Sequence, residues 1–143
     1  MQIVIGGAFN GKNKWVRERT KNLESVEWMN LKEDSKKVNL KQIKESTLIV
    51  SGIEEWTKSY LENETMDEAR ESLKKWIEEL FLWEKRTENG QMILIANDIS
   101  KGIVPIDKKD RDWRDLTGWF YQDLIKKADR VDEIWYGLSR QLK

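Results

Sequence analysis

Short apolar runs separated by helical segments are the feature of this sequence that most constrains its fold. The runs lie at Gln2–Ile5, Leu48–Val50, Met92–Ala96 and Ile134–Tyr136, and Val26–Met29 is a weaker candidate. Strands that are buried on both faces form continuous apolar runs, whereas half-exposed strands alternate apolar and polar residues. We therefore expect an α/β protein in which a mainly parallel sheet is covered by helices on both faces.

Longer segments between these runs have the periodicity of helices. Lys12–Asn22 follows the first run after a short loop, and a late helix places apolar residues on one face from Trp113 to Ala128. Between them, Thr65 and Glu68 match a capping box, in which each side chain bonds the other residue's backbone amide. The helix after this box carries apolar residues at steps of three and four, namely Met66, Ala69, Leu73, Trp76, Ile77, Leu80 and Phe81. Such spacing predicts an amphipathic helix, and most of the tryptophans are expected to pack on helix faces of this kind.

Composition narrows the class of protein. A chain of 143 residues fits one domain with one core, so we expect residues 1–143 to form a single domain. Lys+Arg and Asp+Glu both number 26, and this balance gives no reason to expect nucleic acid or an anionic membrane as the main partner. No run approaches the roughly 18 apolar residues of a membrane span, and the N-terminal apolar stretch lacks the pattern of a signal peptide. With no cysteine present, a cytoplasmic location is expected.

The chain contains no histidine. Histidine is the commonest general base and the commonest metal ligand in proteins, and its imidazole can also accept a phosphoryl group. Any chemistry must therefore come from lysine, aspartate, glutamate or arginine side chains, from backbone amides, or from a bound metal.

The strongest motif is a glycine-rich loop between the first apolar run and the first helix. It fits the phosphate-loop pattern G-x-x-x-x-G-K with the residues Gly6, Gly7, Ala8, Phe9, Asn10, Gly11, Lys12 and Asn13. Glycines let backbone amides turn inward, and the following helix N-terminus adds partial positive charge. Lys12 would reach the outer phosphates as a point charge. An ordinary glycine-rich turn between a strand and a helix is the alternative.

The last position of this loop and the ends of the other strands supply candidate metal ligands. A serine or threonine hydroxyl normally holds Mg²⁺ at the end of the loop, and Asn13 offers a carboxamide oxygen instead. Ligands of parallel sheets collect beyond the carboxyl ends of the strands, where Ser51 and Asp98 are found. We expect Asp98 to hold Mg²⁺, with Glu54 and Glu55 as weaker choices, although Asp98 could equally be a loop cap.

Two arginines three positions apart, Arg111 and Arg114, offer guanidinium groups suited to phosphate. Surface pairing with Asp107, Asp110 or Asp115 is the alternative. The whole stretch from Asp107 to Arg114 has charges of both signs. We expect it to be exposed to solvent, although it could also face a ligand.

Several motifs in the second half of the chain carry a family resemblance. Asn97–Pro105 reads N-D-I-S-K-G-I-V-P, Trp113–Gly118 reads W-R-D-L-T-G, and Gln122, Ala128-Asp129 and Leu142-Lys143 follow at matching positions. These motifs resemble the pattern N-E-V-G-x-G-I-V-P, F-R-D-x-x-G-x-x-N-Q, A-D and L-K of the bifunctional adenosylcobinamide kinase / adenosylcobinamide-phosphate guanylyltransferase family of cobalamin biosynthesis. The loop Gly6–Asn13 is also similar to that family's G-G-A-R-S-G-K-S, and Leu48–Tyr60 is a fainter match.

The resemblance implies a P-loop RecA-like three-layer fold, GTP or ATP with Mg²⁺ as cofactors, a corrinoid such as cobinamide as substrate, and a homotrimer. In an active enzyme we expect Lys12 and Asp98 to be catalytic, Asn13 and Asp98 to hold the metal, and Ser51 and Arg114 to contact the nucleotide. Departures from the pattern are equally informative. The family transfers guanylyl through a histidine that this chain lacks, and Ser51 replaces an acid at the end of the central strand. Two functions stay open, a reduced kinase-type phosphotransferase and a catalytically inactive relative that binds nucleotide or only a partner protein.

Overall fold

The computed structural model describes residues 1–33 and 38–143, and it is built on one mixed sheet. The strands are β1 Gln2–Gly6, β2 Val26–Asn30, β3 Thr47–Ser51, β4 Gln91–Asn97, β5 Arg130–Trp135 and β6 Leu138–Gln141. The helices are α1 Lys12–Thr20, α2 Ile53–Tyr60, α3 Met66–Arg86 and α4 Lys108–Lys127. Across the sheet the strands run in the order β2-β3-β4-β1-β5-β6, and only β6 is antiparallel to its neighbour.

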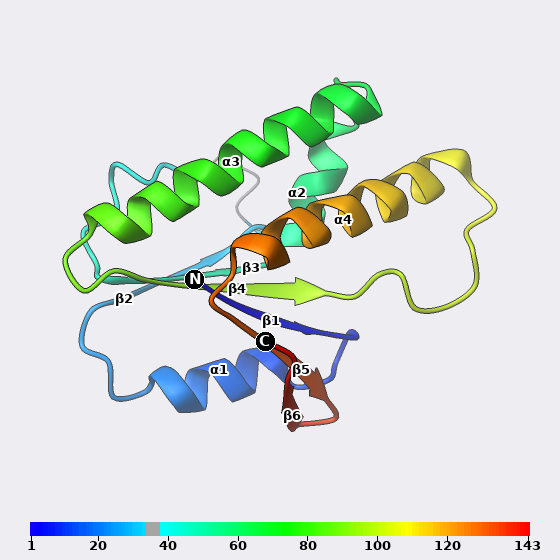
Figure 1. Ribbon diagram of the computed structural model, residues 1–143. Helices are drawn as coiled ribbons and strands as arrows, with labels where there is room; N and C mark the ends of the chain where they lie inside the picture. The colour runs from blue at the N-terminus through cyan, green and yellow to red at the C-terminus, as the bar shows by residue number, and fades with distance from the viewer. Residues whose placement is uncertain (34–37) are drawn as a thin grey trace.

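Helices cover the two faces of this sheet unequally (Figure 1). The helices α2, α3 and α4 lie on one face, above a large core that includes Trp76, Phe120 and Leu124. On the other face α1 lies alone, over a smaller core built around Val16 and Ile134. The expected P-loop RecA-like three-layer α/β fold, with a mainly parallel sheet flanked by helices, is confirmed in this arrangement.

The thinly covered face beside α1 is completed by stacked side chains. Arg17 lies 4.1 Å from the ring centre of Trp28 on β2, and Arg19 lies 4.1 Å from that of Trp15. Both tryptophans are half-buried against the smaller core. A guanidinium over an indole keeps its charge in water while its plane covers apolar surface, so these pairs extend the cover that a nine-residue helix provides.

Most of the expected elements are present, with different ends. The capping box of Thr65 and Glu68 starts α3, which runs on to Arg86. The charged stretch after Asp107 is the first part of α4, with the Asp107 side chain as its N-cap. The last apolar run is not an isolated strand, because β5 turns back into β6 through Tyr136 and Gly137, which both have positive φ. Two such residues form the tight turn that fits the twist of a hairpin.

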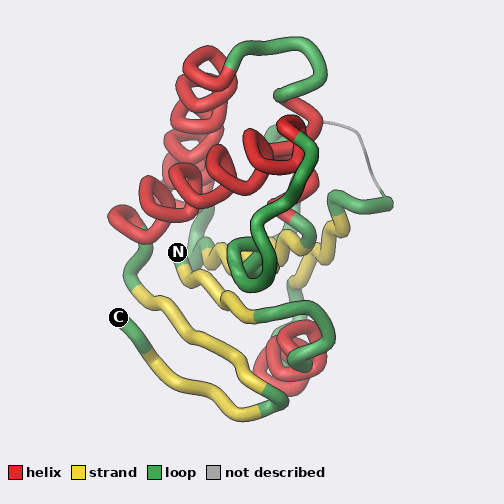
Figure 2. The backbone as a smooth tube through the Cα atoms, turned by 90° about the vertical axis from the view of Figure 1, so that its right-hand side faces the viewer, coloured by secondary structure: helices red, strands yellow, loops and turns green. Residues whose placement is uncertain are grey.

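The carboxyl ends of the parallel strands lie along one edge of the sheet, and Figure 2 looks onto this edge. The loop after β1, the start of α2 after β3 and the long loop after β4 all begin there. Along the described residues 1–33 and 38–143, the search for a helix with the length and apolarity needed to cross a membrane found none.

Candidate functional site

The glycine-rich loop leaves β1 at Gly6 and closes onto α1 at Gly11. Gly11 has φ of 87°, a left-handed conformation that glycine adopts without strain, and Phe9 has φ of 60° at the fully exposed tip of the loop. Gly6 lies so close to β5 that a Cβ atom there would stand 2.2 Å from the Ile134 carbonyl oxygen. The glycine at position 6 therefore lets the loop begin tightly against the neighbouring strand.

The start of α1 leaves backbone donors free. Gly11 caps the helix without a side-chain hydrogen bond, and the first turn contains no acidic residue. None of the residues that the structure describes accepts a hydrogen bond from the amides of Gly11, Lys12 or Asn13. Free amides at a helix N-terminus carry partial positive charge, so this end of α1 is suited to an anion.

Lys12 lies folded back beneath the loop and is 7% exposed. Its Nζ donates to the Gly6 carbonyl at 3.1 Å, the Gly7 carbonyl at 2.7 Å and the Asn97 Oδ1 at 2.6 Å. Burial lowers the pKa of this ammonium group from its ordinary value of 10.5, and the negative charge of Glu54 opposes that effect. All three donors are used within the protein, so Lys12 must exchange some of these acceptors to bind a phosphate.

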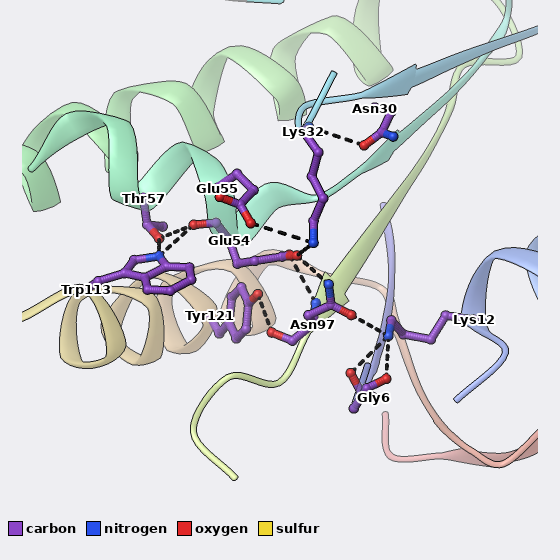
Figure 3. A network of polar contacts seen from close by, with 11 residues as sticks. Gly6, Lys12, Asn30, Lys32, Glu54, Glu55, Thr57, Asn97, Trp113 and Tyr121 are labelled. Atoms are coloured by element: carbon purple, nitrogen blue, oxygen red, sulfur yellow. Dashed lines mark hydrogen bonds and ion pairs between the residues drawn. The ribbon is translucent and has the colours of Figure 1, made fainter. Parts of the chain in front are cut away.

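Asn97, at the end of β4, links Lys12 to a buried carboxylate (Figure 3). Its backbone amide donates to Glu54 Oε2 at 3.2 Å, and its Nδ2 donates to Glu54 Oε1. Because an ionised carboxylate only accepts hydrogen bonds, Glu54 fixes the amide group of Asn97 with Oδ1 toward Lys12. Glu54 is 1% exposed in the first turn of α2.

Lys32 is the cation that faces this carboxylate. Its Nζ lies 3.5 Å from Glu54 Oε1 and 3.6 Å from Glu55 Oε1, and its side chain is half exposed. The backbone amide of Lys32 donates to Asn30 Oδ1 at 3.2 Å, which fixes the turn after β2. A buried carboxylate is costly unless it is paired and hydrogen-bonded, and Lys32 and Asn97 meet both conditions for Glu54.

An open cavity of about 380 Å³ lies between the glycine-rich loop and this turn. Its lining consists of Ala8, Phe9, Gly11, Lys12, Asn13, Lys14, Asn30, Lys32, Ser51, Gly52, Ile95 and Asn97. Three of these residues carry an ammonium group and none carries a carboxylate. With the free amides of α1, the lining is complementary to a polyanion.

Side chains from α4 support the network from the other side (Figure 3). Trp113 Nε1 donates to the Glu54 carbonyl at 2.8 Å and to Thr57 Oγ1 at 3.1 Å. The hydroxyl of Tyr121 donates to the Asn97 carbonyl at 2.8 Å, and burial raises the pKa of this hydroxyl well above its ordinary value. The start of α2 and the end of β4 are thereby held against α4.

Comparison with known proteins places this chain in a family. A sequence model of the family described as cobinamide kinase / cobinamide phosphate guanyltransferase (CobU) matches residues 13–142, which is most of the chain. The chain belongs to this cobinamide kinase / guanyltransferase family. The bifunctional adenosylcobalamin biosynthesis protein CobP of Pseudomonas aeruginosa is 33% identical over 54 residues, which make up 38% of this chain and 31% of that protein. The aligned stretch thus covers less than a third of the CobP length. The family resemblance that the sequence motifs indicated is confirmed by the family match.

Most of the residues proposed from the loop pattern gather at the cavity of this family member. Ala8, Phe9, Gly11, Lys12, Asn13 and Ser51 line it. The other loop residues, Gly6, Gly7 and Asn10, lie behind the lining. Gly6 and Gly7 present carbonyls to Lys12, while the Asn10 carbonyl accepts from the Gly137 amide at 2.9 Å. The Asn10 side chain is buried against Gly7, where it fills part of the space beneath the loop.

Asp98 and Arg114 lie apart from the cavity lining. Asp98 Oδ1 accepts from the Ser100 amide at 3.0 Å and the Ser100 hydroxyl at 2.5 Å, and its other oxygen lies 3.5 Å from the ammonium of Lys101. Burial would raise the pKa of this carboxyl, but the bonds from Ser100 and the charge of Lys101 outweigh it and leave the pKa lowered. Arg114 donates to the Ser100 carbonyl at 2.7 Å. Both residues thus shape the loop after β4.

The metal expectation does not fit the residues around the cavity. The side-chain oxygens in the lining are all neutral, and they belong to Asn13, Asn30, Ser51 and Asn97. Within residues 1–33 and 38–143, no three acidic, cysteine or histidine side chains come together as a metal-binding group. Mg²⁺ in proteins is usually held by one or two carboxylates, which this lining lacks. The residues that the structure describes therefore offer no carboxylate-built magnesium site at the loop.

Sequence reasoning did not find the full network. From the sequence, Glu54 was only a weaker choice as a metal ligand, and Asn97 was only the first residue of a family motif. No local pattern singles out Lys32, which follows a short strand in a polar stretch. Their roles depend on contacts between positions distant in sequence, and only the sheet order brings those positions together.

Proposed function

We propose that this chain binds the phosphates of GTP or ATP with the loop Gly6–Asn13 as a single nucleotide-binding domain, without the guanylyltransferase step of its family. The observation that carries this proposal is the cavity beside the loop, whose lining combines three lysines with the free amides of α1. Amides and ammonium groups that converge on one open space form the standard chemistry of phosphate binding.

Lys12 would be the mobile part of this site. Its ammonium group is held by the carbonyls of Gly6 and Gly7 and by Asn97. A phosphate oxygen carries negative charge, so Coulomb attraction to the ammonium group adds to the hydrogen bond, whereas the carbonyl acceptors of Lys12 are neutral. An incoming phosphate can therefore compete for Lys12, which would swing from the base of the loop into the cavity that it already lines.

Guanylyl transfer by the histidine route is excluded from the proposal, because the chain contains no histidine. A kinase-type transfer needs charge stabilisation on the phosphoryl group and a way to orient the acceptor hydroxyl. Lys12 and Lys14 would supply the first, whereas Asp98 is engaged by Ser100 and Lys101. We infer nucleotide binding with at most a reduced phosphotransferase activity toward cobinamide or a related corrinoid.

The alternative is a catalytically inactive relative that acts in assembly or regulation. The observation that favours it is the resting state of Lys12, whose three donors are satisfied by the protein itself. A homotrimer is proposed for either function, by family resemblance. The free edge at β6 supports association between chains, because Trp135, Tyr136 and Leu138 are exposed beside it and edge strands readily pair with other chains.

Thermal unfolding with GTP and with ATP tests the proposal. A ligand at a hundredfold excess over its Kd stabilises the native state by about 2.7 kcal/mol, which raises the midpoint measurably. We expect wild type to shift and Lys12→Ala not to shift. Lys44→Ala is the control, because Lys44 is exposed near the opposite end of β3 from the cavity.

An unchanged midpoint for wild type with both nucleotides at millimolar concentration would contradict nucleotide binding and leave the assembly role. If wild type does shift, a coupled kinase assay with cobinamide separates a phosphotransferase from a protein that only binds nucleotide.

A further inference from the structure

At the cavity, a lysine lies between a buried carboxylate and the open space. The Glu54 carboxylate lies behind the lining, and the half-exposed Lys32 side chain lies between it and the open space. Glu54 is almost sealed by its bonds to Asn97, and its side chain is 2% exposed. In front of it stands Lys32, whose side chain is 50% exposed and lines the cavity. A phosphate in the cavity would therefore meet the ammonium group of Lys32 and not the carboxylate.

Lys32 also stands where a cation would be expected. Its Nζ lies at 3.5 Å from a Glu54 oxygen and 3.6 Å from a Glu55 oxygen. In a metal-dependent phosphate site, a divalent ion lies between protein carboxylates and the phosphate oxygens. Here the Lys32 ammonium group has the carboxylates of Glu54 and Glu55 on one side and the cavity on the other. It therefore occupies the position that a divalent ion has between carboxylates and phosphate.

We propose that Lys32 takes the place of a divalent metal, so that this chain binds the phosphates of a nucleoside triphosphate, or free pyrophosphate, without Mg²⁺. This inference rests on the proposed nucleotide site. A magnesium ion entering the cavity would approach the ammonium groups of Lys12, Lys14 and Lys32 and would find only neutral oxygens in the described lining. Like charges a few ångströms apart repel strongly outside bulk water, so the ion is disfavoured there.

Calorimetric titration of wild type with GTP and with pyrophosphate, in EDTA and in excess Mg²⁺, tests this inference. We expect binding in EDTA to be at least as tight as binding with Mg²⁺, because Mg²⁺ neutralises charge on the ligand that the lysines would otherwise meet. Lys32→Met should weaken binding in EDTA by about tenfold or more, as expected for the loss of one charge near a phosphate. Lys32→Arg keeps the charge and should retain most of the affinity.

Two controls keep the outcomes distinct. Lys44→Met removes a lysine near the opposite end of β3 and should leave the affinity unchanged. Urea unfolding of Lys32→Met reports whether the variant is folded once Glu54 has lost its cation.

The results of these titrations test the role of Lys32 and the nucleotide site separately. Wild-type binding that requires Mg²⁺ would overturn this inference and leave the nucleotide site standing. Equal affinity of wild type and folded Lys32→Met in EDTA would also overturn it. No wild-type binding under either condition would overturn the nucleotide site itself, together with the inference.

Discussion

Exchanging Gly6 for alanine is expected to destabilise the protein, and the same exchange at Gly118 is expected to stabilise it. At Gly6 the new Cβ would stand 2.2 Å from the Ile134 carbonyl oxygen and 3.3 Å from the carbonyl carbon. Ordinary contacts begin near 3.4 Å, so β1 and β5 must separate by about 1 Å, and overpacking of this kind typically costs about 1–3 kcal/mol. Neither atom can turn aside, because both belong to the backbone of a strand in the sheet.

Gly118 is the matched control within α4. A Cβ there meets nothing within 4 Å, and the residue lies in the middle of a helix. Alanine is favoured over glycine in helix interiors by up to about 1 kcal/mol. The two variants therefore make the same chemical change with opposite expected signs.

Thermal unfolding measures both variants. Unfolding entropies of about 2.1 cal/mol/K per residue give a chain of 143 residues about 0.3 kcal/mol per degree near its midpoint. Gly6→Ala should lower the midpoint by about 3–10 °C, and Gly118→Ala should raise it by about 2–3 °C. A Gly6→Ala midpoint equal to or above that of wild type would refute the close approach of the loop to β5.

Two further predictions concern the support of the site and its electrostatics. Trp113→Phe removes the indole donor to the Glu54 carbonyl and to Thr57, so the free energy of unfolding in urea should fall by about 1 kcal/mol, and an unchanged urea midpoint would argue against these bonds. Burial would raise the pKa of Asp132, but hydrogen bonds, chiefly from the Arg130 guanidinium, outweigh it and leave the pKa below the ordinary value of 3.8. The stabilisation from this carboxylate is therefore fully present above about pH 4 and is lost as the pH falls through the folded-state pKa. Asp132→Asn should lose less stability than wild type between pH 7 and pH 3, whereas parallel losses would count against the ion pair.

The fold could be predicted from the sequence because its strong elements obey local rules. Ile93, Leu94 and Ile95 belong to a short, β-branched-rich apolar run that is typical of a strand covered on both faces, and Thr65 with Glu68 marks the start of α3. The hairpin that ends the sheet was not predicted, because its second strand, Leu138–Gln141, is short and exposed at every position, so it has no apolar pattern. Its turn uses Tyr136 with φ of 47°, a conformation that this residue type rarely adopts.

Only the part of the site that lies within one continuous segment of the chain could be predicted from the sequence. The loop and its lysine follow from spacing, because the strand, the glycines and the helix are consecutive in sequence. Asp98 was chosen for its place at a strand end, yet the structure turns its carboxylate to Ser100 through a local bond that competes with any ligand. Glu54 and Lys32 act through contacts across the sheet, and local patterns do not encode such contacts.

A crystal structure with a non-hydrolysable GTP analogue would show whether the loop Gly6–Asn13 holds the nucleotide phosphates. We expect phosphate oxygens against the amides of Gly11, Lys12 and Asn13, with the Lys12 ammonium moved from the Gly7 carbonyl to a phosphate. A nucleotide bound elsewhere, or a loop that still holds Lys12 against Gly6, Gly7 and Asn97 beside an empty cavity, would contradict it.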